Sequence, residues 1–173
     1  EKPLETKVVY TYDHRGRRTS KEVFNYDMQQ GWVSQDIDLF YYSGAEVIEE
    51  RDAGNQPVRS YVLGLGIDKP IQLKDEITGD VYYYHANQLG TVFALTDANE
   101  VVVERYDYDA FGNMSIYDDT KTNLRSVSVV GNSYGFTGRR YDQETGLYYF
   151  RARYYDHETG RFISRDPMMY VDG

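Results

Sequence analysis

The sequence predicts an all-β fold in which antiparallel hairpins form a curved sheet. Three observations support this: a Tyr-Asp turn phrase that recurs along the chain, a surplus of strand-forming residues, and the lack of a helical stripe. Tyr alone accounts for 19 of the 173 residues, and aromatic residues make up 16%. Tyr, Val, Thr and Phe suit pleated, half-buried surfaces. Internal repetition indicates architecture more firmly than local propensity does, so the phrase carries the most weight.

Each copy of the phrase has an aromatic residue, an Asp, a short polar gap and a Gly, with strand-forming residues on both sides. An Asp side chain accepts hydrogen bonds from the backbone that follows it, and Gly adopts a positive φ without strain. The phrase therefore predicts a strand end followed by a tight turn. The predicted turn residues are Asp13 and Gly16, Asp109 and Gly112, Asp142 and Gly146, and Asp156 and Gly160.

Strands are predicted along the whole chain, separated by turn-forming clusters such as Asp52-Ala53-Gly54-Asn55. Their spacing of roughly 8–12 residues is typical of an all-β sheet, sandwich or barrel wall. The segment 44–51 is the most helix-like, but its flanking turns favour a strand. The predicted strands are 7–12, 17–25, 32–42, 45–51, 56–63, 70–74, 81–84, 91–96, 101–108, 134–137, 147–154 and 161–164.

Two stretches allow more specific predictions. In residues 147–154, strand alternation predicts that Arg151 and Arg153 share one face and that the apolar side chains occupy the other. The polar, turn-rich stretch 116–132 is expected to be an exposed, mobile insertion. The whole chain is expected to be one domain without a linker.

The composition disfavours several classes of function. A net charge of −9 disfavours nucleic acid and any other acidic partner. The lack of Cys excludes disulfides, thiolate nucleophiles and Cys-based zinc sites. No apolar run approaches about 20 residues, so no membrane insertion is expected. The first four residues, EKPL, do not resemble a signal peptide, and we expect them to follow a cut inside a longer protein.

No cofactor or metal site is predicted. His14, His85 and His157 lie at turn phrases or a strand end without metal-ligand spacing, so a surface or turn role is favoured. The acidic clusters that begin at Asp97 and Asp107 carry only part of a calcium-binding loop, which favours turn capping.

From residue 82 onward, a series of motifs resembles a known bacterial family, the Rhs repeat-associated core of Rhs and Tyr-Asp (YD) repeat proteins. Residues before 82 match it more loosely, as preceding repeats. The motifs are HANQLGT at 85–91, LTDAN at 95–99, YDYDAFGN at 106–113, YGFTGR at 134–139, DQETGLYY at 142–149, RARYYD at 151–156 and GRFISRDP at 160–167.

The resemblance implies that residues 1–81 are a YD-repeat β segment and that residues 82–173 are the core, together one continuous unit. It also implies a large bacterial protein, secreted or displayed at the cell surface, whose β strip winds into a shell around a C-terminal toxin. Such a shell encloses and delivers the toxin in intercellular competition or virulence. The expected partners are neighbouring YD repeats and the toxin, and open strand edges would permit self-association.

In relatives the core also carries an aspartyl self-cleavage site. Arg165 and Asp166 match the Arg-Asp of the family's Arg-Asp-Pro motif, but the second Asp-Pro-x-Gly-Leu motif, where cleavage occurs, is absent from this sequence. Aspartyl chemistry needs two carboxylates that share a proton, and Asp172 matches no motif. We therefore predict that this chain is not an enzyme and that Asp166 caps the final turn.

The Tyr surplus leaves two functions open. Tyr can pack with one end while its hydroxyl stays wet, which suits a shell wall, and its ring face can also stack on a sugar or peptide. The alternative function is therefore an adhesive or carbohydrate-binding β module at a cell surface. An exposed aromatic row on one strand face would favour that alternative. A concave face lined with small and polar residues, together with open edges, would favour the shell.

Overall fold

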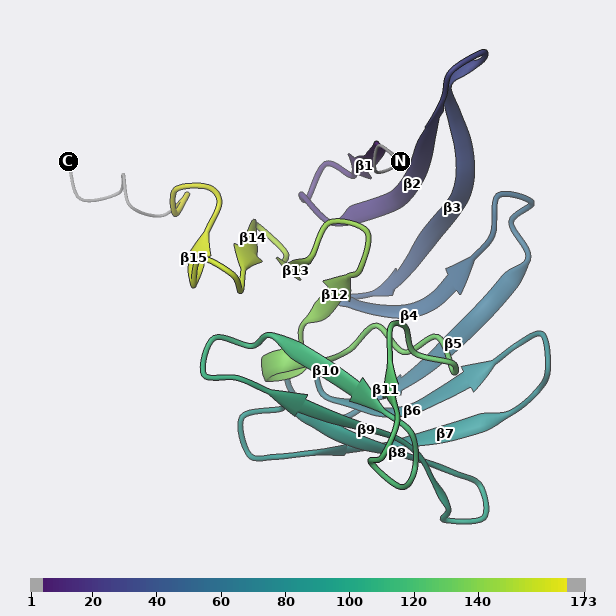
Figure 1. Ribbon diagram of the computed structural model, residues 1–173, viewed down its shortest axis with the longest axis vertical. Coiled ribbons are helices and arrows are strands. Elements are labelled where there is room, and N and C mark those ends of the chain that lie inside the picture. Colours follow the sequence, from purple (N-terminus) through teal and green to yellow (C-terminus); the bar gives the residue numbers. More distant parts are fainter. Residues whose placement is uncertain (1–4, 168–173) are drawn as a thin grey trace.

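The computed structural model describes residues 5–167, which form two antiparallel sheets (Figure 1). The larger sheet has eleven strands in chain order, each paired with the next, which confirms the predicted all-β antiparallel fold. Its strands are β1 (Thr6–Tyr12), β2 (Arg18–Asp27), β3 (Gly31–Ser43), β4 (Glu46–Arg51), β5 (Pro57–Leu63), β6 (Pro70–Asp75), β7 (Val81–Ala86), β8 (Val92–Asp97), β9 (Val102–Tyr108), β10 (Met114–Tyr117) and β11 (Leu124–Arg125).

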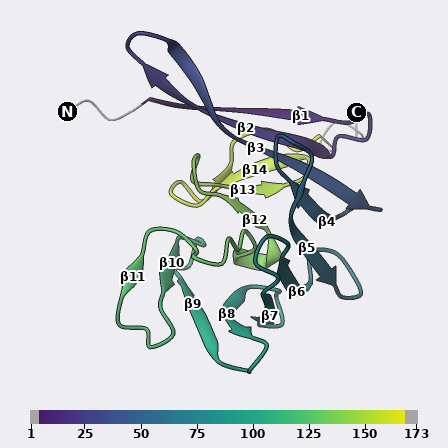
Figure 2. The same cartoon turned by 90° about the vertical axis from the view of Figure 1, so that its right-hand side faces the viewer.

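The smaller sheet, which the sequence did not predict as a separate unit, lies inside the curve of the larger one (Figure 2). A short 3₁₀ helix, η1 (Phe136–Gly138), leads into it. Its strands are β12 (Arg140–Asp142), β13 (Leu147–Phe150), β14 (Arg153–Asp156) and β15 (Arg161–Phe162).

Register shifts give the larger sheet its curvature. The β2–β3 pairing shifts between Val23 and Phe24, and similar shifts recur in most of the pairings up to β8–β9. A bulge adds a residue to one strand and increases the local twist, so a series of bulges bends a long meander. The sheet is continuous across residues 81 and 82, because β7 begins at Val81 and pairs with β6.

The core lies between the concave face of the larger sheet and the segment that precedes β12. Leu73, Val92 and Leu95 are completely buried there. Tyr61 and Tyr134 belong to the same cluster and meet edge to face, with ring centroids 5.3 Å apart. Many of the Tyr residues therefore serve packing, with the hydroxyl bonded at the edge of the core.

Residues 147–154 do not form the single strand predicted. Arg151 has φ of 61°, and the chain reverses there to make the β13–β14 hairpin. Arg151 pairs with Glu46, whereas Arg153 pairs with Asp166, so the two guanidinium groups do not share one strand face. A left-handed turn at a non-glycine residue carries no clear sequence signal.

The predicted strand 134–137 is also wrong, because η1 and an isolated bridge occupy it.

The prediction of an exposed, mobile insertion at 116–132 is partly wrong: residues 119–124 are exposed, as expected, but both ends of the stretch are built into the fold. β10 and β11 pair within this stretch, and Val130 is buried in the core cluster. The cause is Glu104, a completely buried carboxylate on β9. It accepts hydrogen bonds from the Ser128 hydroxyl at 2.7 Å and the Val129 amide at 2.6 Å, and so fixes the polar segment against the sheet.

The edges of the larger sheet lead to the first prediction. Within residues 5–167, β1 and β11 each pair on one side only. Unpaired strand edges template further pairing, so we expect the purified chain to self-associate as its concentration rises. Light scattering over a wide concentration range measures this. A constant monomeric mass would contradict the prediction.

Candidate functional site

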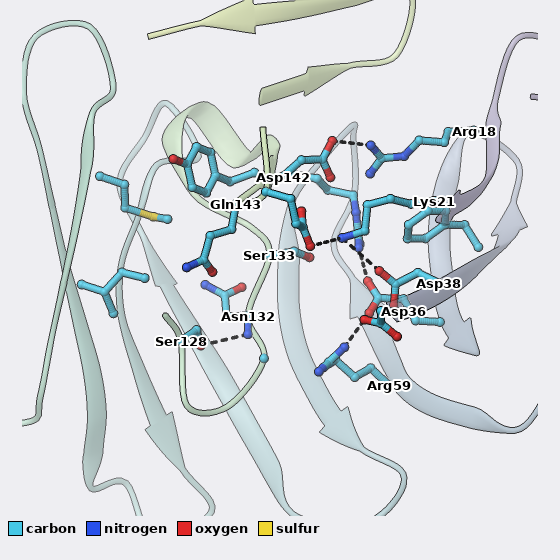
Figure 3. Close-up of a pocket in the computed structure, with 18 residues that line it drawn as sticks. Arg18, Lys21, Asp36, Asp38, Arg59, Ser128, Asn132, Ser133, Asp142 and Gln143 are labelled. Atoms are coloured by element: carbon cyan, nitrogen blue, oxygen red, sulfur yellow. Dashed lines mark hydrogen bonds and ion pairs between the residues drawn. The ribbon is translucent and has the colours of Figure 1, made fainter. Parts of the chain in front are cut away.

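A charged cavity of about 190 Å³ lies between the concave face of the larger sheet and residues 128–144 (Figure 3). Figure 3 shows Lys21, Asp38 and Arg59 on one side of it, with Asn132 and Gln143 on the other. The sheet side chains reach the cavity because they occupy inward-facing positions of β2, β3 and β5.

Arg18 and Asp142 form the most deeply buried ion pair of this site, which joins β2 to β12. Only 2% of the Arg18 side chain and 3% of the Asp142 side chain are exposed. The Arg18 guanidinium lies 4.4 Å from the centre of the Tyr149 ring, and the Tyr10 hydroxyl donates to Asp142 at 3.2 Å. Burial and the Asp142 carboxylate raise the pKa of Tyr10, so this hydroxyl stays protonated and remains a donor.

Glu50 on β4 binds two guanidinium groups. Its carboxylate accepts from Arg59 on β5 at 3.0 Å, from the Tyr61 hydroxyl at 2.9 Å, and from Arg140 on β12. Burial raises the pKa of Glu50, but Arg140 and Arg59 outweigh burial and lower this pKa to about 2. Gly131 makes room for Arg59, because a Cβ at that position would lie 2.3 Å from Arg59 Nε.

Lys21 holds two carboxylates at the outer part of the cavity. Its ammonium lies 3.0 Å from Asp38 on β3 and 3.0 Å from Glu144 in the turn after β12. Burial raises the pKa of Asp38 despite Lys21, and the negative charges of Glu50 and Asp36 add to the rise. A chain of ion pairs therefore runs from the larger sheet to β12 and the turn that follows it.

A second cluster joins the sheets near the β5–β6 loop. Asp68 pairs with Arg139 and, at 2.7 Å, with Arg151, which also reaches Glu46 at 2.9 Å. Gly138 packs so closely that a Cβ there would lie 2.2 Å from the Asp68 carbonyl oxygen. These contacts fix η1 and the β13–β14 turn against the larger sheet.

The predicted turn residues lie at turns. Asp109 Oδ1 accepts from the amides of Phe111 at 2.8 Å and Asn113 at 2.9 Å, and Asp13 and Asp156 make similar contacts. Asp142 differs: its backbone carbonyl accepts from Gly146 at 2.9 Å while its carboxylate binds Arg18. The φ angles are 74° at Gly16, 93° at Gly112, 69° at Gly146 and 66° at Gly160.

These turn glycines give a second prediction. Gly146→Ala should cost about 1–2 kcal/mol, because positive φ is strained for a residue with a Cβ and nothing else lies within 3.9 Å of that position. Gly112→Ala should cost more, since its Cβ would lie 2.6 Å from the Phe136 ring. Urea denaturation measures both losses. Equal stability of both variants and wild type would show that these turns do not need glycine.

Arg165 and Asp166 lie just after β15, away from the charged cavity. Asp166 pairs with Arg153 at 3.1 Å, and the Arg153 guanidinium lies 3.7 Å from the centre of the Phe162 ring. Asp172, the other carboxylate considered for aspartyl chemistry, lies outside the described residues.

The third prediction is that Asp166 does not cleave this chain. Aspartyl chemistry needs a second carboxylate that shares a proton with the first, whereas Asp166 pairs with the guanidinium of Arg153. The purified chain should keep its full mass for days at mildly acidic and neutral pH, and Asp166→Asn should change stability only slightly. Intact-mass spectrometry of both proteins measures this. A time-dependent cut in wild type that Asp166→Asn abolishes would overturn the prediction.

The three histidines lie apart. His14 and His85 are at a turn and in β7, as expected for surface residues, but His157 is 7% exposed and packs between the rings of Tyr141 and Tyr148. His157 therefore lies in a turn, as the surface-or-turn prediction allows, but it is buried rather than at the surface. Within residues 5–167, no three His, Asp or Glu side chains are grouped to hold a metal ion.

The charged side chains that line the cavity connect the larger sheet to the smaller one. The cations and carboxylates of the cavity form ion pairs that connect the two sheets. Separating the sheets would leave the buried charges without their partners, so these pairs oppose separation. In the same described range, no helix has the length and apolar character needed to cross a bilayer.

No protein-family model matches the chain, but the whole chain is similar to part of longer proteins that are named as tRNA nucleases. It is 37% identical over 175 residues to the tRNA3(Ser)-specific nuclease WapA of Bacillus spizizenii and 38% identical to the tRNA nuclease WapA of Bacillus subtilis strain 168. All of the chain is covered in both cases, but it spans only 7% of each relative.

Solved structures share the fold. The TcdB2-TccC3 crystal structure matches the whole chain with a TM-score of 0.69 at 17% identity, and the Tc holotoxin pore of Photorhabdus luminescens matches it with 0.65 at 18% identity. The chain covers 8% of each of these much longer chains.

Proposed function

We propose that this chain is a wall segment of an Rhs-type shell that encloses a C-terminal toxin in a larger bacterial protein, secreted or displayed at the cell surface. The observation that carries the proposal is the match of the whole chain to a stretch of TcdB2-TccC3, at a TM-score of 0.69. The similarity to WapA supports the toxin class, since WapA is named as a tRNA nuclease. The nuclease activity itself is not proposed for this chain.

The two sheets suit this role in different ways. The larger sheet is a continuous meander whose outer strands pair on one side only within residues 5–167, so neighbouring repeats could extend it. The smaller sheet covers the concave side and is held there by the buried pair of Arg18 and Asp142. We infer that the first sheet forms the wall and the second closes part of its inner surface.

Limited proteolysis of the longer protein tests this function. The segment downstream of residue 173 should resist protease in wild type and become more sensitive in Asp142→Ala, which weakens the contact between the two sheets. Arg51→Ala is the control, because Arg51 pairs with Glu49 on its own strand at the surface. Equal digestion of the downstream segment in wild type and Asp142→Ala would contradict the shell function.

The adhesive or carbohydrate-binding alternative has one specific observation in its favour. Tyr26 and Trp32 face each other across the β2–β3 hairpin, and both are at least 40% exposed. Lys7 lies 5.2 Å from the centre of the Trp32 ring, so one ring face is already covered. Glycan-array binding that Trp32→Ala abolishes would favour the alternative, and an array without signal would remove it.

A further inference from the structure

The inner end of the charged cavity contains hydrogen-bond donors that have no acceptor. Within the described residues, Arg59 Nε, Ser133 Oγ, and both Nε and Nη1 of Arg140 are buried without a partner. All three residues line the cavity, and Figure 3 shows Arg59 and Ser133 at its wall. Arg140 is 7% exposed. An unpaired buried donor is costly, particularly on a charged group, so these atoms call for an acceptor.

The nearby carboxylate does not bind these donor atoms. Glu50 already accepts from Arg59, Arg140 and the Tyr61 hydroxyl. Two guanidinium groups therefore share one carboxylate, which leaves one excess positive charge at this end of the cavity.

The remaining charges do not cancel this excess locally. Asp142 is paired with Arg18, and Lys21 lies between Asp38 and Glu144. The two carboxylates that make the cavity acidic as a whole are at its outer part: the Glu144 side chain is 26% exposed and Asp36 is exposed. Water screens these outer charges more than it screens the buried guanidinium groups.

We propose that the inner end of this cavity binds one free monovalent anion of the size of chloride or formate between Arg59, Arg140 and Ser133. Such an ion accepts hydrogen bonds without donating any, which matches the unpaired donors, and it neutralises the excess charge. Arg59 belongs to β5, whereas Ser133 and Arg140 belong to the segment that enters the smaller sheet. The ion therefore stabilises the contact between the two sheets.

Thermal unfolding of the purified chain tests the site, with chloride replaced by gluconate, a bulkier anion, at constant ionic strength and pH. At a chloride concentration ten times the Kd, the midpoint should rise by about 3–5 °C over gluconate. Ser133→Ala and Arg59→Gln should each lose more than half of this rise. Arg51→Gln removes the same charge outside the cavity, and this variant should show the full chloride-dependent rise of the midpoint.

Crystals grown in bromide give an independent readout, since bromide scatters anomalously. The expected result is one anomalous peak within hydrogen-bonding reach of Arg59, Arg140 and Ser133. Ordered water at that position without an anomalous peak would overturn the proposal. A chloride-dependent rise of equal size in wild type and Ser133→Ala would also overturn it, because the effect would then arise elsewhere on the protein.

Discussion

Asp142→Ala should lower the free energy of unfolding by about 3–5 kcal/mol, because it leaves the guanidinium of Arg18 buried without its carboxylate. The Arg18 side chain is only 2% exposed and cannot turn out to water without moving β2 or β12. The same change removes the acceptor of the Tyr10 hydroxyl. Urea denaturation followed by tyrosine and tryptophan fluorescence measures the loss, and hydrogen exchange should show that β12 and β13 lose protection first.

Two controls separate burial from loss of charge. Asp107→Ala removes an equal charge from a pair with Lys121, in which both side chains are 49% exposed, and should cost at most about 1 kcal/mol. The double variant Arg18→Met with Asp142→Leu removes the pair without leaving a lone charge and should recover much of the loss. Equal losses in Asp142→Ala and Asp107→Ala would show that the buried pair does not hold the sheets together.

The larger sheet could be predicted from the sequence because its hairpins are local. β4 and β5 flank the Asp52–Asn55 cluster, and Asp52 Oδ1 accepts from the Gln56 amide at 2.8 Å, as the turn chemistry requires. Each such pairing joins residues close in the chain. The all-β class and the order of strands β1 to β9 follow from those signals.

The charged cavity could not be predicted in the same way. Arg18 and Asp142 are 124 residues apart in the chain, and the turn phrase assigned Asp142 to capping alone. A partial signal was present for a buried carboxylate outside the cavity: Glu104 lies two residues from Tyr106 on the buried face of β9, where an apolar side chain is the rule. A carboxylate at an inward-facing position of a strand indicates a buried partner. The alternation of side chains along the strand does not identify which cation that partner is.

Glu50→Gln should have an effect of similar size, again about 3–5 kcal/mol, because the buried Arg140 and the partly buried Arg59 lose their common carboxylate. The amide keeps the shape of the side chain and removes its charge. Urea denaturation at neutral pH measures the loss. The double variant Glu50→Leu with Arg140→Met should be less destabilised than Glu50→Gln, since it removes the more buried guanidinium together with the carboxylate and leaves unpaired that of Arg59, whose side chain is 26% exposed.

The pH dependence of stability distinguishes this charge effect from a packing effect. Burial raises the pKa of Glu50, but Arg140 and Arg59 lower it to about 2 in the folded protein, against about 4.5 when unfolded. A carboxyl whose folded pKa is lowered stabilises the fold above its unfolded pKa, and this stabilisation is lost as pH falls toward the folded pKa. The difference in stability between wild type and Glu50→Gln should therefore shrink by about 3 kcal/mol between pH 5 and pH 2. A difference that stays constant over this range would show that Glu50 acts through its shape rather than its charge.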